Sequence, residues 1–323
     1  MMPLRPLRRS LNRVGSLQKP TKAGKNYLAL VTCALVTLMS TGLGFLDYQP
    51  AFAAISCPTG TTLVSINSVD YCKVNYTSGA TTTFTIPATG VSQIKTIITG
   101  GKGRDTPPVN AINGVATGGF GAEITVETNV SAGQVLTLTS SINGGSTATA
   151  NCGSPPTAYG GGYAKLAISG GAQVVAGGGG GGGCSGSSFQ TAKAGNGGNA
   201  GLPEVPGVSS AVPAAAGQST GAGTGGGGGT LIGGGTGGTV TGGGTAGGNG
   251  SALTGGIGAS GGQSAGGGGA GYYGGGAGVT TGFNPPPSGG GGGSSYVSGL
   301  TVTAASFSSS TSLAGSVEVL FQY

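Results

Sequence analysis

The run GGGGGGG at residues 177–183 decides the fold of this chain, together with the runs GGGGG at 225–229 and 289–293. These runs belong to a block from Gly160 to Gly299 in which more than a third of the positions are glycine. Glycine brings no side chain to bury and loses the most backbone freedom on folding, so the block cannot build an ordinary hydrophobic core. The block is therefore either a disordered linker or a structure of extended segments that backbone hydrogen bonds stabilise.

Parts of this block place glycine at every third position, as at Gly255, Gly258 and Gly261. An extended left-handed helix has three residues per turn and no internal hydrogen bonds, and glycine along one edge lets neighbouring helices approach closely. We therefore expect a bundle of short polyglycine-II-type helices in block 177–299, with chain reversals at insertions such as 202–213. A collagen helix is excluded, because the three-residue register breaks repeatedly and proline is scarce.

Short segments rich in β-branched residues flank the glycine block on both sides. In 122–130, alternation places Ile124 and Val126 on a buried face and Glu123 and Glu127 on a solvent face. We expect strands at 82–86, 91–99, 122–130, 134–139, 163–169, 172–176, 300–304 and 316–323. This pattern predicts an all-β fold, an antiparallel jelly-roll-like β-sandwich whose first strands pair with its last strand. The polyglycine bundle is then an insertion into the sandwich.

The first 53 residues have the features of a secretory signal peptide. Seven of the 13 basic residues lie in the first 25 positions, an apolar run follows at 27–46, and Ala51-Phe52-Ala53 is a small-x-small cleavage site. A retained membrane anchor is the alternative, because about 20 apolar residues can span a bilayer. Cleavage leaves six Lys/Arg and six Asp/Glu residues, hence a neutral chain. Such a chain has no electrostatic footprint for nucleic acid or anionic lipid, and neutrality favours self-association.

Four cysteines remain after cleavage: Cys57, Cys72, Cys152 and Cys184. An even number in an exported chain predicts two disulfides, for which three connectivities exist. We favour nearest-neighbour pairing, Cys57 with Cys72 and Cys152 with Cys184. A zinc site is the alternative, but the chain contains no CxxC motif and no histidine. We expect no metal and no cofactor.

These observations divide the chain into a signal peptide (1–53), an N-terminal cysteine-containing β segment (54–80) and a glycine-rich domain (81–323). Within that domain, the sandwich strands occupy 81–176 and 300–323, and the polyglycine block occupies 177–299.

Several motifs follow one another along the glycine-rich domain: FTIP at 84–87, GVSQI at 90–94, GGFGA at 118–122, VSAGQ at 130–134, GYYGGG at 271–276 and SSYV at 294–297. This succession resembles the bacterial secreted glycine-rich domain, and it is similar to the glycine-rich ectodomain segment of anaplastic lymphoma kinase-type receptors. The resemblance implies a jelly-roll-like sandwich from which polyglycine helices project. It also implies an extracellular binding or structural role, since phage tail adhesins use polyglycine bundles to carry receptor-binding loops.

The sequence argues against an enzyme. The absence of histidine removes the commonest general base, and a GxSxG pattern at 258–262 has neither a histidine partner nor the strand-to-helix context that its chemistry needs. Tyr272, Tyr273 and Tyr296 are the candidates for a binding surface, since tyrosines beside glycine give rigid contact area. The alternative, which we favour, is that they fill the junction between bundle and sandwich.

We therefore expect a secreted or cell-surface, non-enzymatic structural and adhesive module, either self-associating or bound to a surface receptor or glycan. The alternative is a soluble extracellular recognition protein that binds a glycan, a receptor or ice through a flat face of the bundle. Neither hypothesis includes nucleic acid, or a membrane after signal cleavage.

Overall fold

The structure is a computed structural model, and it describes residues 57–77, 79–88, 90–106, 115–146, 158–185, 193–261, 263–281 and 284–322. The predicted signal peptide and Cys152 lie outside these residues. Within the described ranges the chain forms strands and extended segments and no helix, which confirms the all-β prediction. In particular, this part of the chain contains no helix of the length and hydropathy that a membrane span requires.

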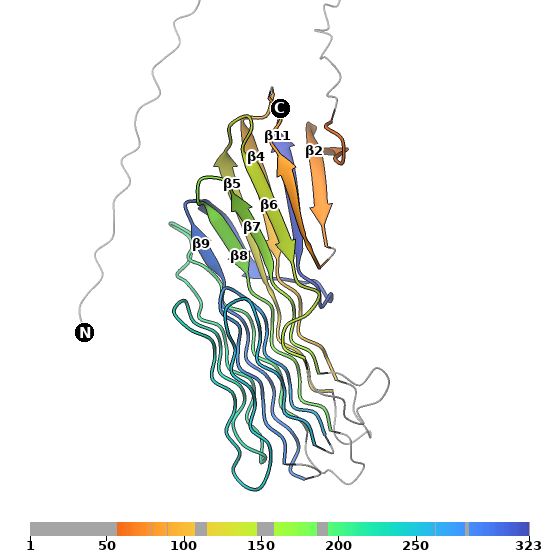
Figure 1. Cartoon of the computed structure of the whole chain (residues 1–323), viewed down its shortest axis with the longest axis vertical. Helices are drawn as coiled ribbons and strands as arrows, with labels where there is room; N and C mark the ends of the chain where they lie inside the picture. Colours follow the sequence, from red (N-terminus) through yellow and green to blue (C-terminus); the bar gives the residue numbers. More distant parts are fainter. Residues whose placement is uncertain are drawn as a thin grey trace, which may run out of the picture. The chain divides into compact units, whose positions relative to one another are not determined.

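Two antiparallel sheets form one end of the described region (Figure 1). The first sheet has the order β1 (Thr62–Ile66), β2 (Val69–Tyr76), β11 (Ser316–Gln322), β4 (Gln93–Thr99), β5 (Ala122–Asn129), β10 (Thr301–Phe307). The second has the order β3 (Thr81–Thr85), β6 (Val135–Ser140), β7 (Ala164–Ile168), β8 (Gln173–Ala176), β9 (Tyr296–Ser298). Strands β4, β5 and β11 of the first sheet contact β6, β7 and β8 of the second, so the sheets pack face to face.

The core lies between these two sheets and follows from the alternation of each strand. In β5, Ile124 and Val126 are fully buried while Glu123 and Glu127 are half-buried on the other face, as the sequence predicts. Across the sandwich, Leu138 of β6 and Phe321 of β11 belong to the same buried cluster. The rings of Phe321 and Phe84, which come from different sheets, lie 4.7 Å apart between centroids. Apolar burial from both sheets therefore stabilises the sandwich.

The last strand is a central strand. β11 pairs with β2 on one side and with β4 on the other. The expected pairing of the first strands with the last is therefore confirmed for the predicted strand 91–99, which is β4, but not for 82–86, which is β3 of the second sheet. Segment 54–80, predicted as a separate cysteine-containing β segment, therefore contributes β1 and β2 to the larger sheet. The β character predicted for 54–80 is thus present, although the bounds of β1 and β2 were not predicted, and β9 was not predicted at all.

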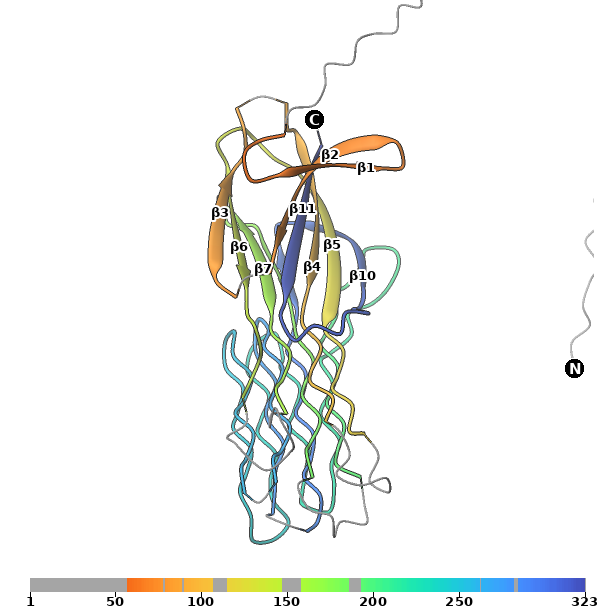
Figure 2. The same cartoon turned by 90° about the vertical axis from the view of Figure 1, so that its right-hand side faces the viewer.

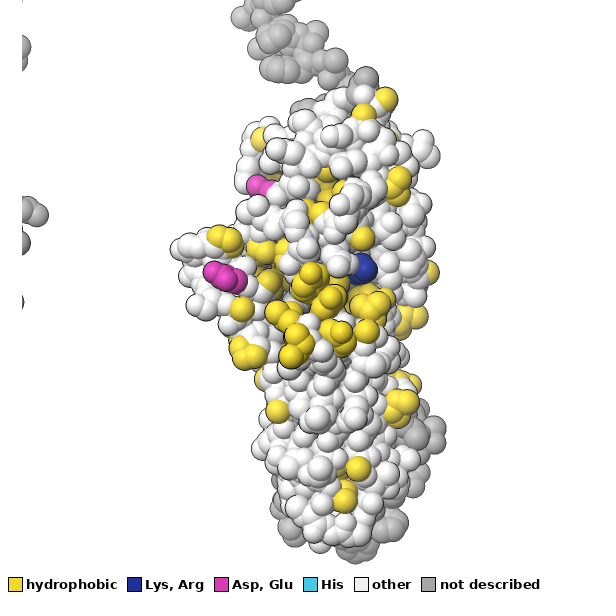
Figure 3. Space-filling model, turned by 60° about the vertical axis from the view of Figure 1, so that its left-hand side comes forward, with side chains coloured by type: hydrophobic (Ala, Val, Ile, Leu, Met, Phe, Trp, Pro, Cys, Tyr) yellow, Lys and Arg dark blue, Asp and Glu magenta, His cyan; other side chains and the backbone are white. Residues whose placement is uncertain are grey.

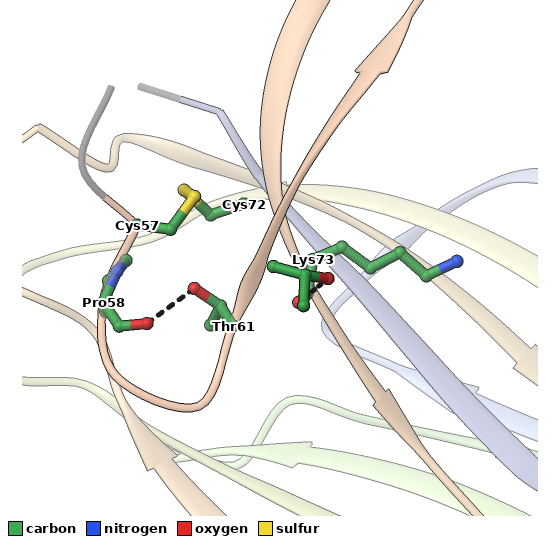
Figure 4. The surroundings of a disulfide bond; sticks show 6 residues. Cys57, Pro58, Thr61, Cys72 and Lys73 are labelled. Atoms are coloured by element: carbon green, nitrogen blue, oxygen red, sulfur yellow. Dashed lines mark hydrogen bonds between the residues drawn. A yellow bond between two sulfur atoms is a disulfide. The ribbon is translucent and has the colours of Figure 1, made fainter. Parts of the chain in front are cut away.

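A two-residue turn joins β1 to β2. Asn67 and Ser68 have φ values of 51° and 63°, and Ile66 pairs with Val69, so the turn is of type I′, which matches the twist of a hairpin. Figure 2 shows this hairpin projecting at the end of the sandwich remote from the glycine-rich segments. A disulfide joins Cys57, just before the hairpin, to the fully buried Cys72 of β2, with a Cα–Cα distance of 5.4 Å (Figure 4). This disulfide confirms the first predicted pairing.

Cys184 is also disulfide-bonded. Its predicted partner Cys152 lies outside the described residues, so this pairing stays a prediction.

Beyond the sandwich the chain runs back and forth in extended, glycine-rich segments (Figure 1). These segments hydrogen-bond to one another through their backbones. They include most of the described part of 177–299. They also include four segments between the sandwich strands, at 100–106, 115–121, 141–146 and 158–163.

Candidate binding surface beside the glycine-rich segments

The hydrogen bonds of segment 177–184 repeat every third residue. Its N–H groups donate to 264–270 from Gly178, Gly181 and Cys184, to 101–104 from Gly179 and Gly182, and to 195–198 from Gly180 and Gly183. Its carbonyls accept from three further segments, at 119–122, 290–293 and Gly161. This segment is therefore surrounded by six neighbours, and none of its glycines, 177–183, has room for a side chain.

Segment 289–294 shows the same period of three. Its N–H groups donate to 215–218 from Gly289 and Gly292, to 178–181 from Gly290 and Gly293, and to 273–276 from Gly291 and Ser294. A Cβ atom added at Gly180, Gly268 or Gly290 would lie less than 3.0 Å from a carbonyl oxygen of a neighbouring segment. The glycine runs 177–183 and 289–293, all of whose residues are buried, are thus segments that other segments enclose.

Peripheral segments carry side chains at every third position. In 254–260, Thr254, Ile257 and Ser260 are exposed, whereas the glycines between them are buried. Segments 224–230 and 233–239 lie beside each other, and their exposed threonines, Thr224, Thr230, Thr236 and Thr239, stand at the same three-residue spacing, with glycine at the remaining positions 227 and 233. The spacing of non-glycine residues therefore reports which edge of a segment faces solvent.

The three candidate tyrosines lie together where the glycine-rich segments meet the sandwich. Gly275 and Gly278 donate to Gly269 and Gly266, so the chain reverses at Tyr272 and Tyr273. The Tyr272 ring stacks on Tyr296 of β9 at 4.1 Å between centroids, and it meets Tyr273 edge to face at 5.2 Å. All three side chains are half-buried. Aromatic stacking thus joins this chain reversal to the edge strand of the second sheet.

Ser294 and Ser295, which precede β9, hold four other chain segments at this junction. The Ser295 hydroxyl donates to the Gly201 carbonyl at 2.6 Å and accepts from the Gly177 N–H at 3.0 Å. The Ser294 hydroxyl donates to the Thr230 carbonyl at 2.8 Å and accepts from the Tyr273 N–H at 3.0 Å. In the SSYV motif, the two serine hydroxyls therefore hydrogen-bond to neighbouring chain segments, and the tyrosine stacks on Tyr272.

We expect Ser295→Ala to lower the free energy of unfolding by about 2–4 kcal/mol, because a buried N–H and a buried carbonyl each lose their partner. The measurement is urea unfolding followed by circular dichroism. Ser298→Ala, the same truncation three residues further on at the end of β9, is the control and should change stability by less than about 0.5 kcal/mol. Equal effects of the two changes would show that the Ser295 hydroxyl does not hold the junction.

An open groove of about 790 Å³ lies beside this junction. Its walls come from the insertion 202–213, the turn at Thr230 and Leu231, and the sandwich edge around Val297 and Leu300. Figure 3 shows hydrophobic side chains gathered on this face. Such a volume lies within the range of ligand pockets, about 300–1,000 Å³.

The groove is apolar both inside and around its rim. Leu202, Val212 and Tyr296 line it, and Val208 and Ile232 in the two flanking turns are 80% and 92% exposed. Among the described lining residues, Glu204 carries the one charge. The sequence interpretation missed this groove, although the proline- and valine-rich insertion LPEVPGVSSAVP at 202–213 was its signal.

Charged side chains in the described region form surface pairs. Lys73 lies 2.5 Å from Glu318, Lys95 lies 3.3 Å from Glu127, and Lys102 lies 2.5 Å from Asp105. Glu127, on the solvent face of β5, thus neutralises Lys95, which lies opposite it in β4. The described residues contain no group of three or more potential metal ligands.

Comparison with known proteins gives no family for this chain. No family model matches the sequence, and the search of curated proteins found no match either.

Proposed function

We propose that this protein is an exported, non-enzymatic structural and adhesive module at the cell surface or in the extracellular matrix. The observation that carries the proposal is the three-residue hydrogen-bond period of 177–184 and 289–294, with neighbours on every side. In this proposal, backbone hydrogen bonds between many segments make the glycine-rich region rigid. The region also contains few charged residues. The apolar groove at its junction with the sandwich gives this region a contact surface.

In this proposal the glycine-rich segments form a bundle of polyglycine-II-type helices inserted into a jelly-roll-like sandwich. A period of three along each segment is what a helix with three residues per turn requires. The lack of room for a Cβ at Gly180, Gly268 and Gly290 supports the same conclusion. The kinship with bacterial secreted glycine-rich domains, proposed from the order of the sequence motifs, agrees with this architecture.

Export is part of the proposal. The Cys57–Cys72 disulfide supports it, because disulfides persist in oxidising compartments. The signal-like residues 1–53 support it from the sequence. The absence of histidine supports a non-enzymatic role.

A second candidate function is recognition of a glycan, a receptor or ice through a face of the bundle. The observation that favours it is the threonine-bearing surface of two neighbouring segments. Thr224 and Thr239 lie side by side there, their hydroxyl oxygens 3.3 Å apart, and Thr230 and Thr236 are exposed on the same two segments. Threonine hydroxyls on a rigid backbone would suit an ordered ligand.

The test compares cells that produce the wild-type protein, no protein, or the Gly268→Ala variant, in which the packing of the bundle is disrupted. Surface exposure is measured by antibody labelling of intact cells, and adhesion by the fraction of cells retained on a surface under flow. We expect labelling with the wild type, and retention that falls to the level of cells without the protein when the bundle is disrupted. Retention that is the same in all three strains would overturn the adhesive role. Thermal hysteresis of the purified protein, lost in a Thr236→Tyr/Thr239→Tyr variant, would instead establish ice recognition.

A further inference from the structure

Strand β1 is an edge strand whose outer side is unprotected. It ends the strand order of the first sheet and pairs with β2 alone. Four of its five residues are exposed, among them Leu63 at 53% and Ile66 at 41%. An exposed, uncharged and apolar edge strand is a template for pairing with another strand.

The type I′ turn fixes which backbone groups of β1 are free. In a two-residue hairpin the residues that flank the turn, here Ile66 and Val69, form a hydrogen-bonded pair, and such pairs then alternate along the ladder. The backbone groups of Val64 therefore point to Tyr71, its partner in β2. Those of Leu63 and Ser65 point away from β2, toward the open side.

The other three sheet edges differ from β1. β10 is interrupted by a register shift between Val302 and Ala304, a bulge of the kind that blocks edge pairing. β9 has only three residues. β3 exposes threonines, and its one large apolar residue, Phe84, packs against the core. β1 is thus the edge that combines a free ladder with exposed aliphatic side chains.

We propose that β1 is a self-association site, where a second copy of this chain adds its own β1 antiparallel about a two-fold axis through Val64. In this register Leu63 of each copy exchanges two backbone hydrogen bonds with Ser65 of the other. Two six-stranded sheets become one continuous sheet. The pairing is isologous, so it closes at a dimer rather than growing into a fibre.

This register is self-complementary on the face of β1 that carries Val64. Val64 and Tyr71 are paired across β1 and β2. The dimer therefore places four side chains in a row across the joined sheet: Tyr71 and Val64 of one copy, followed by Val64 and Tyr71 of the other. On the same face, Ile66 and Val69 of one copy lie beside Thr62 of the other. Aromatic and β-branched neighbours are favourable cross-strand pairs. β1 contains no charged residue, so the register places no like charges opposite one another.

The test uses the full-length, oxidised protein in sedimentation velocity over a range of concentrations. We expect a wild-type dimer. Val64→Lys and Val64→Glu should each be monomeric, because each places two like charges directly opposite across the axis. A mixture of these two variants should recover the dimer, since lysine then faces glutamate.

Two further variants separate pairing from misfolding. Ser65→Pro removes an N–H that points away from β2, so it should abolish the dimer and leave the hairpin and its disulfide intact. Thr303→Pro, at the bulge of the opposite edge β10, should leave the dimer unchanged. Circular dichroism and thiol titration check the fold of each variant. The proposal is overturned by a wild type that stays monomeric at every concentration, by a dimer that survives Ser65→Pro, or by a charge mixture that stays monomeric.

Discussion

Gly268→Ala is expected to lower the free energy of unfolding by about 3–5 kcal/mol, from overpacking and from the loss of buried backbone hydrogen bonds. Gly268 donates to Gly256 at 2.9 Å and accepts from Gly145 at 2.7 Å. An added Cβ would lie within 3.0 Å of the Gly275 carbonyl oxygen, so a neighbouring segment would have to move. If the Gly275 segment moves away, the hydrogen bond that Gly256 donates to the Gly275 carbonyl lengthens; if Gly268 moves instead, its own bonds to Gly256 and Gly145 weaken.

The matched control is Gly242→Ala. Gly242 is exposed, and an added Cβ there meets no atom within 4 Å. Alanine at such a position restricts the unfolded chain and should be neutral or stabilise the protein by about 0.4–1 kcal/mol. Urea unfolding measures both variants, and amide hydrogen exchange over 255–276 locates the change. Similar small effects of the two substitutions would show that the glycine-rich segments are a loose, linker-like region, and the proposed adhesive body would lose its rigidity.

The sequence predicted those features of the fold that depend on local pattern. Alternation of apolar and polar residues placed eight strands within a few residues of their observed bounds, and it gave the buried face of β5 correctly. β9 was not predicted, because three residues are too few to show the alternation of a strand. Segment 54–80 was predicted as β, but its division into β1 and β2 was not, because the turn Asn67-Ser68 contains no glycine although both residues adopt positive φ.

Which segments are neighbours could not be predicted. Backbone-to-backbone bonds between glycines carry no side-chain specificity, so nothing in the run 177–183 indicates that 264–270 and 289–294 lie beside it. The tyrosines were found as a set from their residue type. Their stacking depends on a chain reversal at Tyr272 and Tyr273 that the sequence does not mark. The groove was missed for a related reason, since insertion 202–213 lines it together with residues almost 100 positions away.

Phe321→Ala is expected to destabilise the sandwich by about 3–5 kcal/mol, the range for removing a buried aromatic ring from a core. Phe321 is fully buried near the end of the described chain, and its ring packs on Phe84 of the opposite sheet. Its strand β11 joins β2 to β4 at the centre of the first sheet. Removing the ring would leave a cavity between the two sheets, at a place where strands distant in sequence pack against one another.

The control for this change is Gln322→Ala, one residue further along the same strand, where the side chain is exposed. We expect it to change stability by less than about 0.5 kcal/mol. Thermal unfolding measured by circular dichroism compares the two, and hydrogen exchange in β2 and β4 shows whether the loss spreads to both neighbours of β11. A Phe321→Ala variant as stable as Gln322→Ala would mean that the sandwich does not depend on its last strand. The β1–β2 hairpin would then be held by the Cys57–Cys72 disulfide rather than by the pairing of β2 with β11, and the dimer proposed through β1 would survive the loss of Phe321.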